Sequence, residues 1–414
     1  MRWRRPSAMR TRAFARASGS AQQPAFTVLD LGTTYVKALV VTTDGQRGEV
    51  WGVGRCRLRG LRRGRVAVVS AVSMACETAL CQAEDMTLRT CGVALVPDRA
   101  VLGLSGAVIH TVITPTKTLR PRPDDRVRIE ELHSLADRSL RLARSQAEQA
   151  GPVELVQAEP LSVTVDGHRV SDVTRFRGRE LGLDLFFAFI PQIQGQALRR
   201  LRQRLELDIM TTVAGPLALA AARREDGLFI DLGGVATDLT LMRHGQLAVT
   251  SHLPSGGASF DRELARHLEL TPARAELVKL SYEAGQLDPQ VSAEQTVAAV
   301  YQRESAIWLE SLQPILRRFS DGHPLPASVW LCGGGSQLDQ VLQACQQFPW
   351  MQRLAFVRYP QVRRLGPLDL PAVLDRTGGK LTMQDVPALA LAQGSLSHIT
   401  TQPEPNSLAH TLTL

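Results

Sequence analysis

The sequence is poor in several features that mark particular classes of protein. It contains no run of about 18 apolar residues, the length needed to cross a membrane as a helix. Aromatic residues make up only 5% of the chain, which argues against a surface that stacks nucleic-acid bases. Only four of the 48 basic residues are lysines, and the arginines are spread along the chain. We therefore expect no nucleic-acid partner, although the formal net charge is +8.

Motifs for zinc and for the commonest nucleotide folds are also missing. The six cysteines form no Cys-x-x-Cys pair and have no zinc-like spacing to histidine, as is typical of reduced thiols in a cytoplasmic protein. The chain has no GxxxxGK[ST] sequence, which excludes a P-loop.

The two ends of the chain differ in charge. Residues 1–25 carry six arginines and no acidic residue, and they lack the apolar core of a secretory signal. We expect a disordered basic tail there, of a composition suited to contact acidic phospholipid. Residues 401–414 contain two prolines and no Lys or Arg, so we expect a second disordered tail rather than an amphipathic membrane helix.

One pattern occurs twice, about 200 residues apart. Residues 26–41 read FTVLDLGTTYVKALVV, and residues 228–242 read LFIDLGGVATDLTLM. Each segment is an apolar run ending in Asp-Leu-Gly, then small and hydroxyl residues, then a second apolar run, which predicts strand, tight turn and strand. Because a strand follows the turn, neither segment is the strand-to-helix turn of a dinucleotide fold.

The first turn combines groups that bind phosphate. Gly32 permits a crowded backbone, and successive amide groups of such a turn can surround an anion. Thr33 and Thr34 add hydroxyl groups, and Lys37 adds a cation. Asp30, at the end of the strand, is placed to hold Mg²⁺ through water.

The second turn repeats this arrangement with Asp231, Gly233, Gly234 and Thr237. Two such hairpins facing each other across a cleft would bind a triphosphate from both sides. Asp231 and its counterpart in the first hairpin would then flank the Mg²⁺.

A third Gly-rich turn follows the strand predicted at residues 329–332. Its Gly333, Gly334, Gly335 and Ser336 let the backbone approach a flat group such as adenine, because glycine has no Cβ atom.

In this order, the three turns resemble the first phosphate, second phosphate and adenosine motifs of the actin-like ATPase superfamily. The resemblance implies an α/β fold in which a ribonuclease H-like domain is duplicated and ATP with Mg²⁺ binds between the copies. In that superfamily an acid and a lysine on one helix of the second domain contact ribose and adenine. Glu276 and Lys279, three residues apart on the helix predicted at 271–284, match them. A surface ion pair is the alternative interpretation of these two residues.

The predicted elements divide the chain into segments. We expect the first actin-like domain at 26–106 and 192–225, interrupted at 107–191 by a small α+β insert with the order strand, helix, strand, strand. We expect the second domain at 226–386, with a helical subdomain at about 255–325, and a closing helix at 387–400. Within the first domain the pattern predicts a helix at 66–83 and a strand at 89–97.

The insert resembles the SHS2-type insert of FtsA, the bacterial cell division protein, and of its relative PilM. The segments at 159–191, 253–285 and 386–396 also resemble FtsA, and the similarity extends over about 26–396. It implies an actin-like cytoskeletal scaffold that assembles into filaments and binds the FtsZ C-terminal tail and other divisome proteins. Such a protein is cytoplasmic and peripheral to the inner membrane. A PilM-like protein of the type IV pilus inner-membrane platform is the alternative.

Two departures from the family pattern bear on activity. FtsA proteins reach the membrane through a C-terminal amphipathic helix, which residues 401–414 do not resemble. Three alternatives follow: the basic arm substitutes, a partner supplies the membrane contact, or the protein does not tether to the membrane. The stretch TTVAGPLALAAA at 211–222 has no Gln, Glu or Asp to polarise water, so we expect weak or absent ATP hydrolysis.

A sugar or acetate kinase is disfavoured. Such an enzyme needs a catalytic Asp as a base, whereas the acids of the small insert fall in turns or on strand faces (Asp124, Asp125, Asp166 and Asp184).

Overall fold

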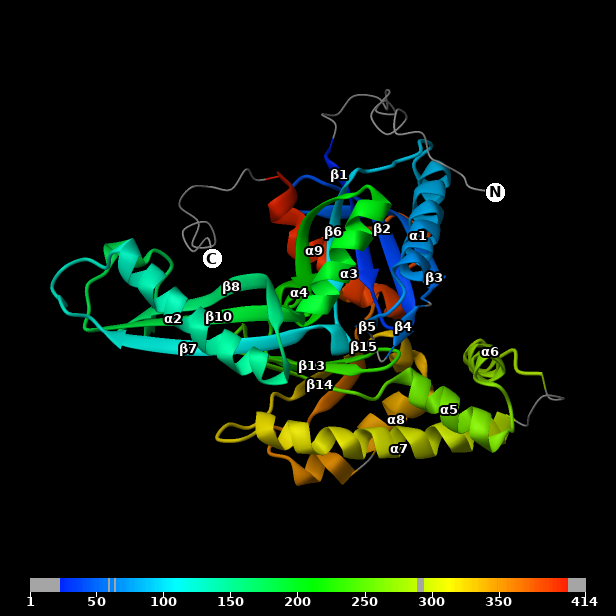
Figure 1. Cartoon of the computed structure of the whole chain (residues 1–414). Coiled ribbons are helices and arrows are strands. Elements are labelled where there is room, and N and C mark those ends of the chain that lie inside the picture. Colours follow the sequence, from blue (N-terminus) through cyan, green and yellow to red (C-terminus); the bar gives the residue numbers. More distant parts are fainter. Residues whose placement is uncertain (1–22, 59, 63–64, 289–293, 348, 401–414) are drawn as a thin grey trace.

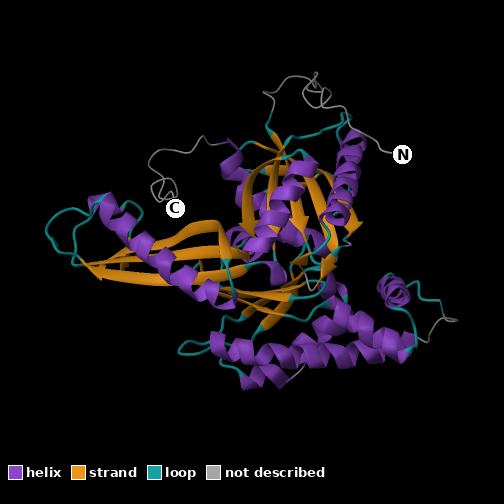
Figure 2. Cartoon of the chain, viewed as in Figure 1, coloured by secondary structure: helices purple, strands orange, loops and turns teal. Residues whose placement is uncertain are grey.

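The computed structural model describes residues 23–58, 60–62, 65–288, 294–347 and 349–400 (Figure 1). The expectations for the two tails lie almost wholly outside these residues. Within them, three larger β-sheets and the helices packed on them build the molecule (Figure 2). No helix in these ranges is both long and apolar enough to span a bilayer.

The first sheet has the strand order β11-β6-β1-β2-β3-β17. The strands β1 to β3 form an antiparallel meander, and β6 and β11 run parallel to β1. The strand bounds are β1 (Ala25–Leu31), β2 (Tyr35–Thr43), β3 (Gly48–Arg57), β6 (Arg99–Leu104), β11 (Asp208–Ala214) and β17 (Val373–Asp375). Four helices accompany this sheet: α1 (Val69–Thr90), α3 (Gln192–Leu205), α4 (Gly215–Ala222) and α9 (Val386–Thr400). A two-stranded ribbon, β4 (Leu61–Arg62) with β5 (Arg65–Val66), precedes α1.

The second sheet repeats the arrangement of the first. Its order is β14-β13-β12-β15-β16, so an antiparallel meander again lies beside a parallel strand. The bounds are β12 (Gly227–Leu232), β13 (Thr237–Arg243), β14 (Gln246–Leu253), β15 (Ser328–Cys332) and β16 (Gln361–Arg364). Its helices are α5 (Gly257–His267), α6 (Pro272–Glu283), α7 (Glu294–Phe319) and α8 (Asp339–Gln347). This duplication is the predicted fold class.

The insert projects from the first sheet as a separate layer (Figure 1). Its chain order is β7 (His110–Leu119), α2 (Ile129–Ala147), β8 (Val153–Val165), the short β9 (His168–Arg169) and β10 (Glu180–Pro191). The sheet order is β7-β10-β8-β9, and α2 lies along one face. Every second residue of β10 packs under α2, including Leu183, Leu185, Phe187 and Phe189.

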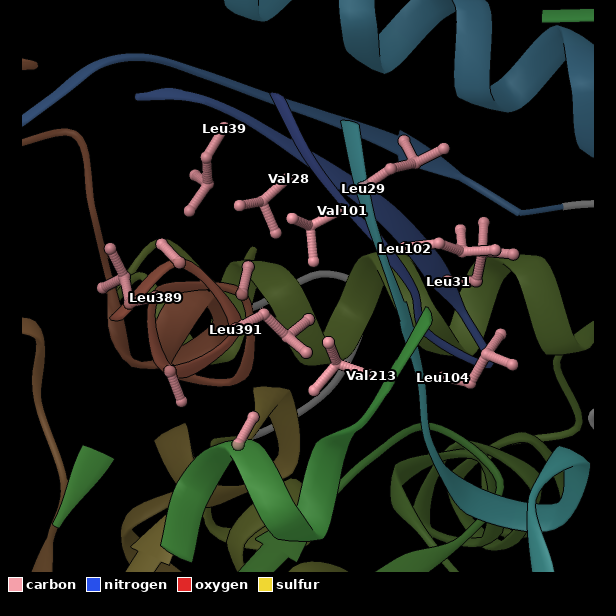
Figure 3. Packing of buried hydrophobic residues seen from close by; sticks show 14 of the residues in the cluster. Val28, Leu29, Leu31, Leu39, Val101, Leu102, Leu104, Val213, Leu389 and Leu391 are labelled. Atoms are coloured by element: carbon pink, nitrogen blue, oxygen red, sulfur yellow. The ribbon is translucent and has the colours of Figure 1, made fainter. Parts of the chain in front are cut away.

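The helix α9 closes the core of the first sheet. Val28 and Val101 are direct partners on adjacent strands and face Leu389 and Leu391 of α9 (Figure 3). Gly103 lies on the same face, where a Cβ atom would come within 2.0 Å of Leu391 Cδ1. Only glycine allows α9 to approach the sheet this closely.

The strand expected at residues 89–97 is wrong. The helix α1 continues to Thr90, and the strand β6 begins at Arg99. Gly52 and Gly54 of β3 allow the helix to approach the sheet closely, because Cβ atoms there would lie 1.9 Å from backbone oxygens of Ala83 and Ala79. The helix therefore lies directly on the strand backbone, and its contact stripe extends to the buried Thr87.

A buried ion pair ties the start of α9 to the first sheet. Arg55 Nε on β3 donates to Asp385 Oδ1 at 2.7 Å, and Arg55 Nη2 pairs with the second carboxylate oxygen. The same carboxylate accepts from the backbone N–H of Thr382 at 2.8 Å. Asp385 is fully buried, so its charge depends on these partners.

We expect Arg55→Ala to lower the free energy of unfolding by about 3–5 kcal/mol, because it leaves a buried carboxylate without its cation. Urea denaturation followed by circular dichroism measures the change. The matched control is Arg376→Ala, which removes a half-exposed pair with Glu49 and should cost about 1 kcal/mol or less. Equal losses in the two variants would contradict the structural role of Arg55.

Candidate functional site

The two repeated hairpins face each other, and their strands pair in the same register within each hairpin. In the first hairpin, Asp30 of β1 lies directly opposite Lys37 of β2. In the second, Asp231 of β12 lies opposite Asp238 of β13. Cross-strand partners project from the same face of a sheet, so each hairpin presents two charged side chains together.

A cleft between the two sheets collects most of the residues predicted to bind a ligand. The empty space within it, including the part open to solvent, is about 980 Å³. The predicted residues that line it are Asp30, Gly32, Thr33, Thr34, Lys37, Asp231, Gly233, Gly234, Glu276, Lys279, Gly333, Gly334 and Gly335.

Two predicted residues do not line the cleft. The Thr237 hydroxyl donates to the carbonyl of Ser255 at 2.7 Å and accepts from Trp308 Nε1 at 2.9 Å. The Ser336 hydroxyl donates to the carbonyl of Gly333 at 2.7 Å. Both side chains are fully buried, so they support the turns from behind instead of facing a ligand.

Lys37 is held as a charged group inside the cleft. Its ammonium lies 3.0 Å from Asp30 Oδ2, and both residues are buried. Burial alone would lower the pKa of Lys37, but the neighbouring Asp30 and Asp231 outweigh it and hold the pKa above its ordinary value. The Asp30–Lys37 pair of the first hairpin therefore carries no net charge.

The second hairpin carries no Lys or Arg between its two aspartates. Burial raises the pKa of Asp231 to about 6, against the pull of Lys37 and with help from Asp30. Burial and then Asp231 raise the pKa of Asp238 to about 7, although the N–H of Gly106 donates to it at 2.7 Å. These raised pKa values indicate that the two carboxylates have too few positively charged neighbours. A divalent cation such as Mg²⁺ would supply the missing positive charge.

The hairpins touch at the end of the cleft where Gly234 meets Thr34. A Cβ atom on Gly234 would lie 1.7 Å from Thr34 Oγ1, so this position requires glycine. Beside it, the N–H of Val235 donates to Thr33 Oγ1 at 3.1 Å. The first amide groups of α5 hold the second hairpin, since Gly257 and Ala258 donate to the carbonyls of Gly233 and Gly234.

The third turn lies against the second hairpin. Gly333 has a φ of +81°, and a Cβ atom there would lie 2.1 Å from Asp231 Oδ1. Arg364 donates to the carbonyls of Ser336 and Gln337 and fixes the far side of the turn. The turn thus presents bare backbone to the cleft.

Glu276 and Lys279 of α6 enter the cleft with different partners. Lys279 Nζ lies 2.8 Å from Asp261 Oδ1. Glu276 is only 5% exposed and pairs with Arg57 of β3. The alternative interpretation, a surface ion pair between the two, is therefore wrong.

Further polar residues line the cleft that the sequence did not single out: Tyr35, Asp261, Glu283, Gln337 and Gln384. Glu283 follows Lys279 by one helical turn, a spacing that could have revealed it. Burial raises the pKa of Glu283 to about 7, with Asp261 adding to the shift and Lys279 opposing it. Asp261 and Gln384 come from other segments, and no local pattern identifies them.

The raised pKa of Asp238 predicts a pH-dependent stability. The folded protein holds this proton up to about pH 7, whereas the unfolded chain releases it near the ordinary aspartate value of 3.8. Stability is therefore lost as pH rises between these values. Asp238→Asn should raise the free energy of unfolding by on the order of 1–3 kcal/mol at pH 8 and by much less at pH 4.5. The unfolding temperature should rise accordingly.

Thermal unfolding in EDTA at the two pH values measures the difference. Asp208→Asn, at an exposed site at the start of β11, is the matched control and should show no such pH dependence. An equal effect of Asp238→Asn at both pH values would contradict the buried, partly protonated carboxyl.

Comparisons with known proteins bear on both sequence and fold. No protein-family model matches the chain. It is 24% identical over 354 residues to the cell division protein FtsA of Streptococcus pneumoniae, covering 79% of this chain and 74% of that protein. It is 22% identical over 388 residues to FtsA of Bacillus subtilis, covering 91% of this chain and 78% of that protein.

Among solved structures, the PilM–PilN type IV pilus biogenesis complex contains a chain that superposes with a TM-score of 0.65 at 17% identity. The superposition covers 92% of this chain and all of that one. The ethanolamine utilization protein EutJ of Carboxydothermus hydrogenoformans gives a TM-score of 0.50 at 13% identity, with 90% of each chain covered. At these identities the likeness concerns the fold, which confirms the predicted fold class. The chain therefore resembles FtsA proteins in sequence and has the actin-like ATPase fold.

Proposed function

We propose that this chain is an ATP-binding, actin-like scaffold protein of bacterial cell division that recruits FtsZ and other divisome proteins. It acts in the cytoplasm, peripheral to the inner membrane, and assembles into filaments. The observation that carries the nucleotide assignment is the pair of facing hairpins with matched register. Similarity to FtsA proteins over most of the chain supports the cellular role.

The cleft offers groups of both signs, as a metal-bound polyphosphate requires. The amide and hydroxyl groups of the two hairpin turns would bind phosphate oxygens, with Lys37 as the cation. Asp30 and Asp231 would hold Mg²⁺ through water, which fits the shortage of positive charge around them. Mg²⁺ supplies the charge that neutralises the phosphates.

The other end of the cleft would receive the nucleoside. The bare backbone of Gly333, Gly334 and Gly335 forms one wall for the adenine. Glu276 and Lys279, on the opposite helix, are in position to contact the ribose and base.

Hydrolysis has little support from the connector that leads from β11 into α4. This connector approaches the cleft at Gly215, which packs against Ser105, a residue of the cleft wall. Its residues 211–222 include no carboxylate or amide side chain that could polarise a water molecule. ATP would therefore act as a ligand that gates assembly, with slow or negligible turnover.

Asp231→Ala should reduce ATP affinity at least about a hundredfold, since it removes a central carboxylate of the site. Equilibrium binding of ATP with Mg²⁺ by calorimetry measures this. Asp208→Ala is the matched control, at the opposite end of its strand from the cleft, and should bind as the wild type does. Retained affinity in Asp231→Ala would contradict the site, and turnover of about 10 per second or more, ordinary for enzymes, would contradict the gating role.

A PilM-like role in the type IV pilus platform is the second candidate. The fold likeness to a chain of the PilM–PilN complex over nearly the whole chain favours it.

Binding of two labelled peptides by fluorescence anisotropy separates the two roles. We expect an FtsZ C-terminal tail peptide to bind and a PilN N-terminal peptide not to bind, with a scrambled FtsZ tail as control. The reverse result would select the pilus role.

A further inference from the structure

Three side chains meet at the mouth of the cleft and bridge its two sides. Tyr35 is the first residue of β2, immediately after the turn of the first hairpin, and Arg57 is the last residue of β3. They are direct cross-strand partners, so both project from one face of the first sheet. Glu276 comes from α6 on the other side. Its Oε2 pairs with Arg57 Nη1, and its Oε1 accepts from the Tyr35 hydroxyl at 3.3 Å.

The burial of the Glu276 carboxylate makes the contact stronger than an ordinary surface pair. The Glu276 side chain is only 6% exposed, whereas the Arg57 side chain is 48% exposed. A carboxylate removed from water depends on its hydrogen-bond partners, so the bridge is favoured while the cleft is closed. Burial and then Glu276 raise the pKa of Tyr35, which keeps its hydroxyl a donor at neutral pH.

The bridge extends from the cleft to the surface, where the Arg57 side chain is half exposed. Tyr35 and Glu276 line the cleft themselves. The phosphate end is already crossed by the contact of Val235 with Thr33 and by that of Gly106 with Asp238. Polar contacts therefore join the two halves of the protein at both ends of the cleft, on either side of a ligand bound between the hairpins.

We propose that Tyr35, Arg57 and Glu276 form a strap that closes over a bound nucleotide and sets its rate of release. The inference rests on the proposed nucleotide binding. Glu276 can serve both purposes, because two carboxylate oxygens offer about four acceptor positions. One set of positions holds the strap while another accepts from a ribose hydroxyl. Arg57 and Tyr35 are thus positioning residues that act through Glu276.

The strap makes a specific prediction about kinetics. Arg57→Ala removes the charged half of the bridge without removing a group that lines the cleft. Release of a fluorescent ATP analogue, chased with excess ATP in a stopped-flow instrument, should become about tenfold faster, because the buried Glu276 carboxylate loses its cationic partner. Tyr35→Phe should accelerate release less, because its hydroxyl contact is long.

Two variants separate the strap from a general loss of packing. Arg57→Lys keeps a cation at the end of β3 and should recover much of the slow release. Arg376→Ala removes another half-exposed arginine that is paired with β3 and should leave release unchanged. Circular dichroism at the temperature of the release measurement should show that every variant is folded.

The outcomes distinguish this inference from the proposed function. If the wild type binds the analogue and Arg57→Ala releases it no faster, or more slowly, the strap is overturned while nucleotide binding stands. If the wild type fails to bind the analogue with Mg²⁺, the proposed function is overturned, and the strap falls with it. Faster release restored by Arg57→Lys supports both.

Discussion

Three buried carboxylates and one ammonium group meet where the two halves of the duplicated fold face each other. Lys37 neutralises Asp30, but among the described residues Asp231 and Asp238 have no comparable ion pair. Buried charge is costly unless it is compensated, so the folded chain retains an unmet demand for a cation at this point. The turns beside it present amide groups with the opposite preference. The cleft is therefore complementary to a metal with a polyphosphate, and less so to either alone.

The contacts between the two halves differ from one side of the molecule to the other. Behind the cleft, apolar packing is continuous, since Phe229 and Met242 of the second sheet join the core of the first. At the cleft, the bridges between the halves are polar, as where Val235 donates to Thr33 or Glu276 pairs with Arg57. Polar groups that separate regain hydrogen bonds with water, whereas exposing apolar surface to water is unfavourable. The halves should thus separate more easily at the cleft than behind it.

The sequence predicts those features of the site that depend on neighbouring residues. It does not predict features that depend on residues far apart in the chain. The hairpin turns were predictable because their chemistry lies within a few consecutive residues. Thr237 fits the same local pattern, yet Trp308 from a distant helix turns its hydroxyl away from the cleft. The strand expected at 89–97 failed for a similar reason, because α1 packs on β3 as far as the buried Thr87, a contact that no local pattern reveals. Arg57 carries no motif, and only the register of β2 with β3 gives it a role.

The duplication also explains why the two hairpins are not equivalent. Their registers match, so Lys37 and Asp238 occupy corresponding positions. A second lysine in place of Asp238 would neutralise the remaining carboxylate and remove the demand for a metal. A second aspartate in place of Lys37 would add a fourth buried carboxylate and raise the cost of folding. One cation among three carboxylates lies between these limits. It keeps the unliganded fold stable while leaving the charge imbalance on which the proposed metal–nucleotide binding depends.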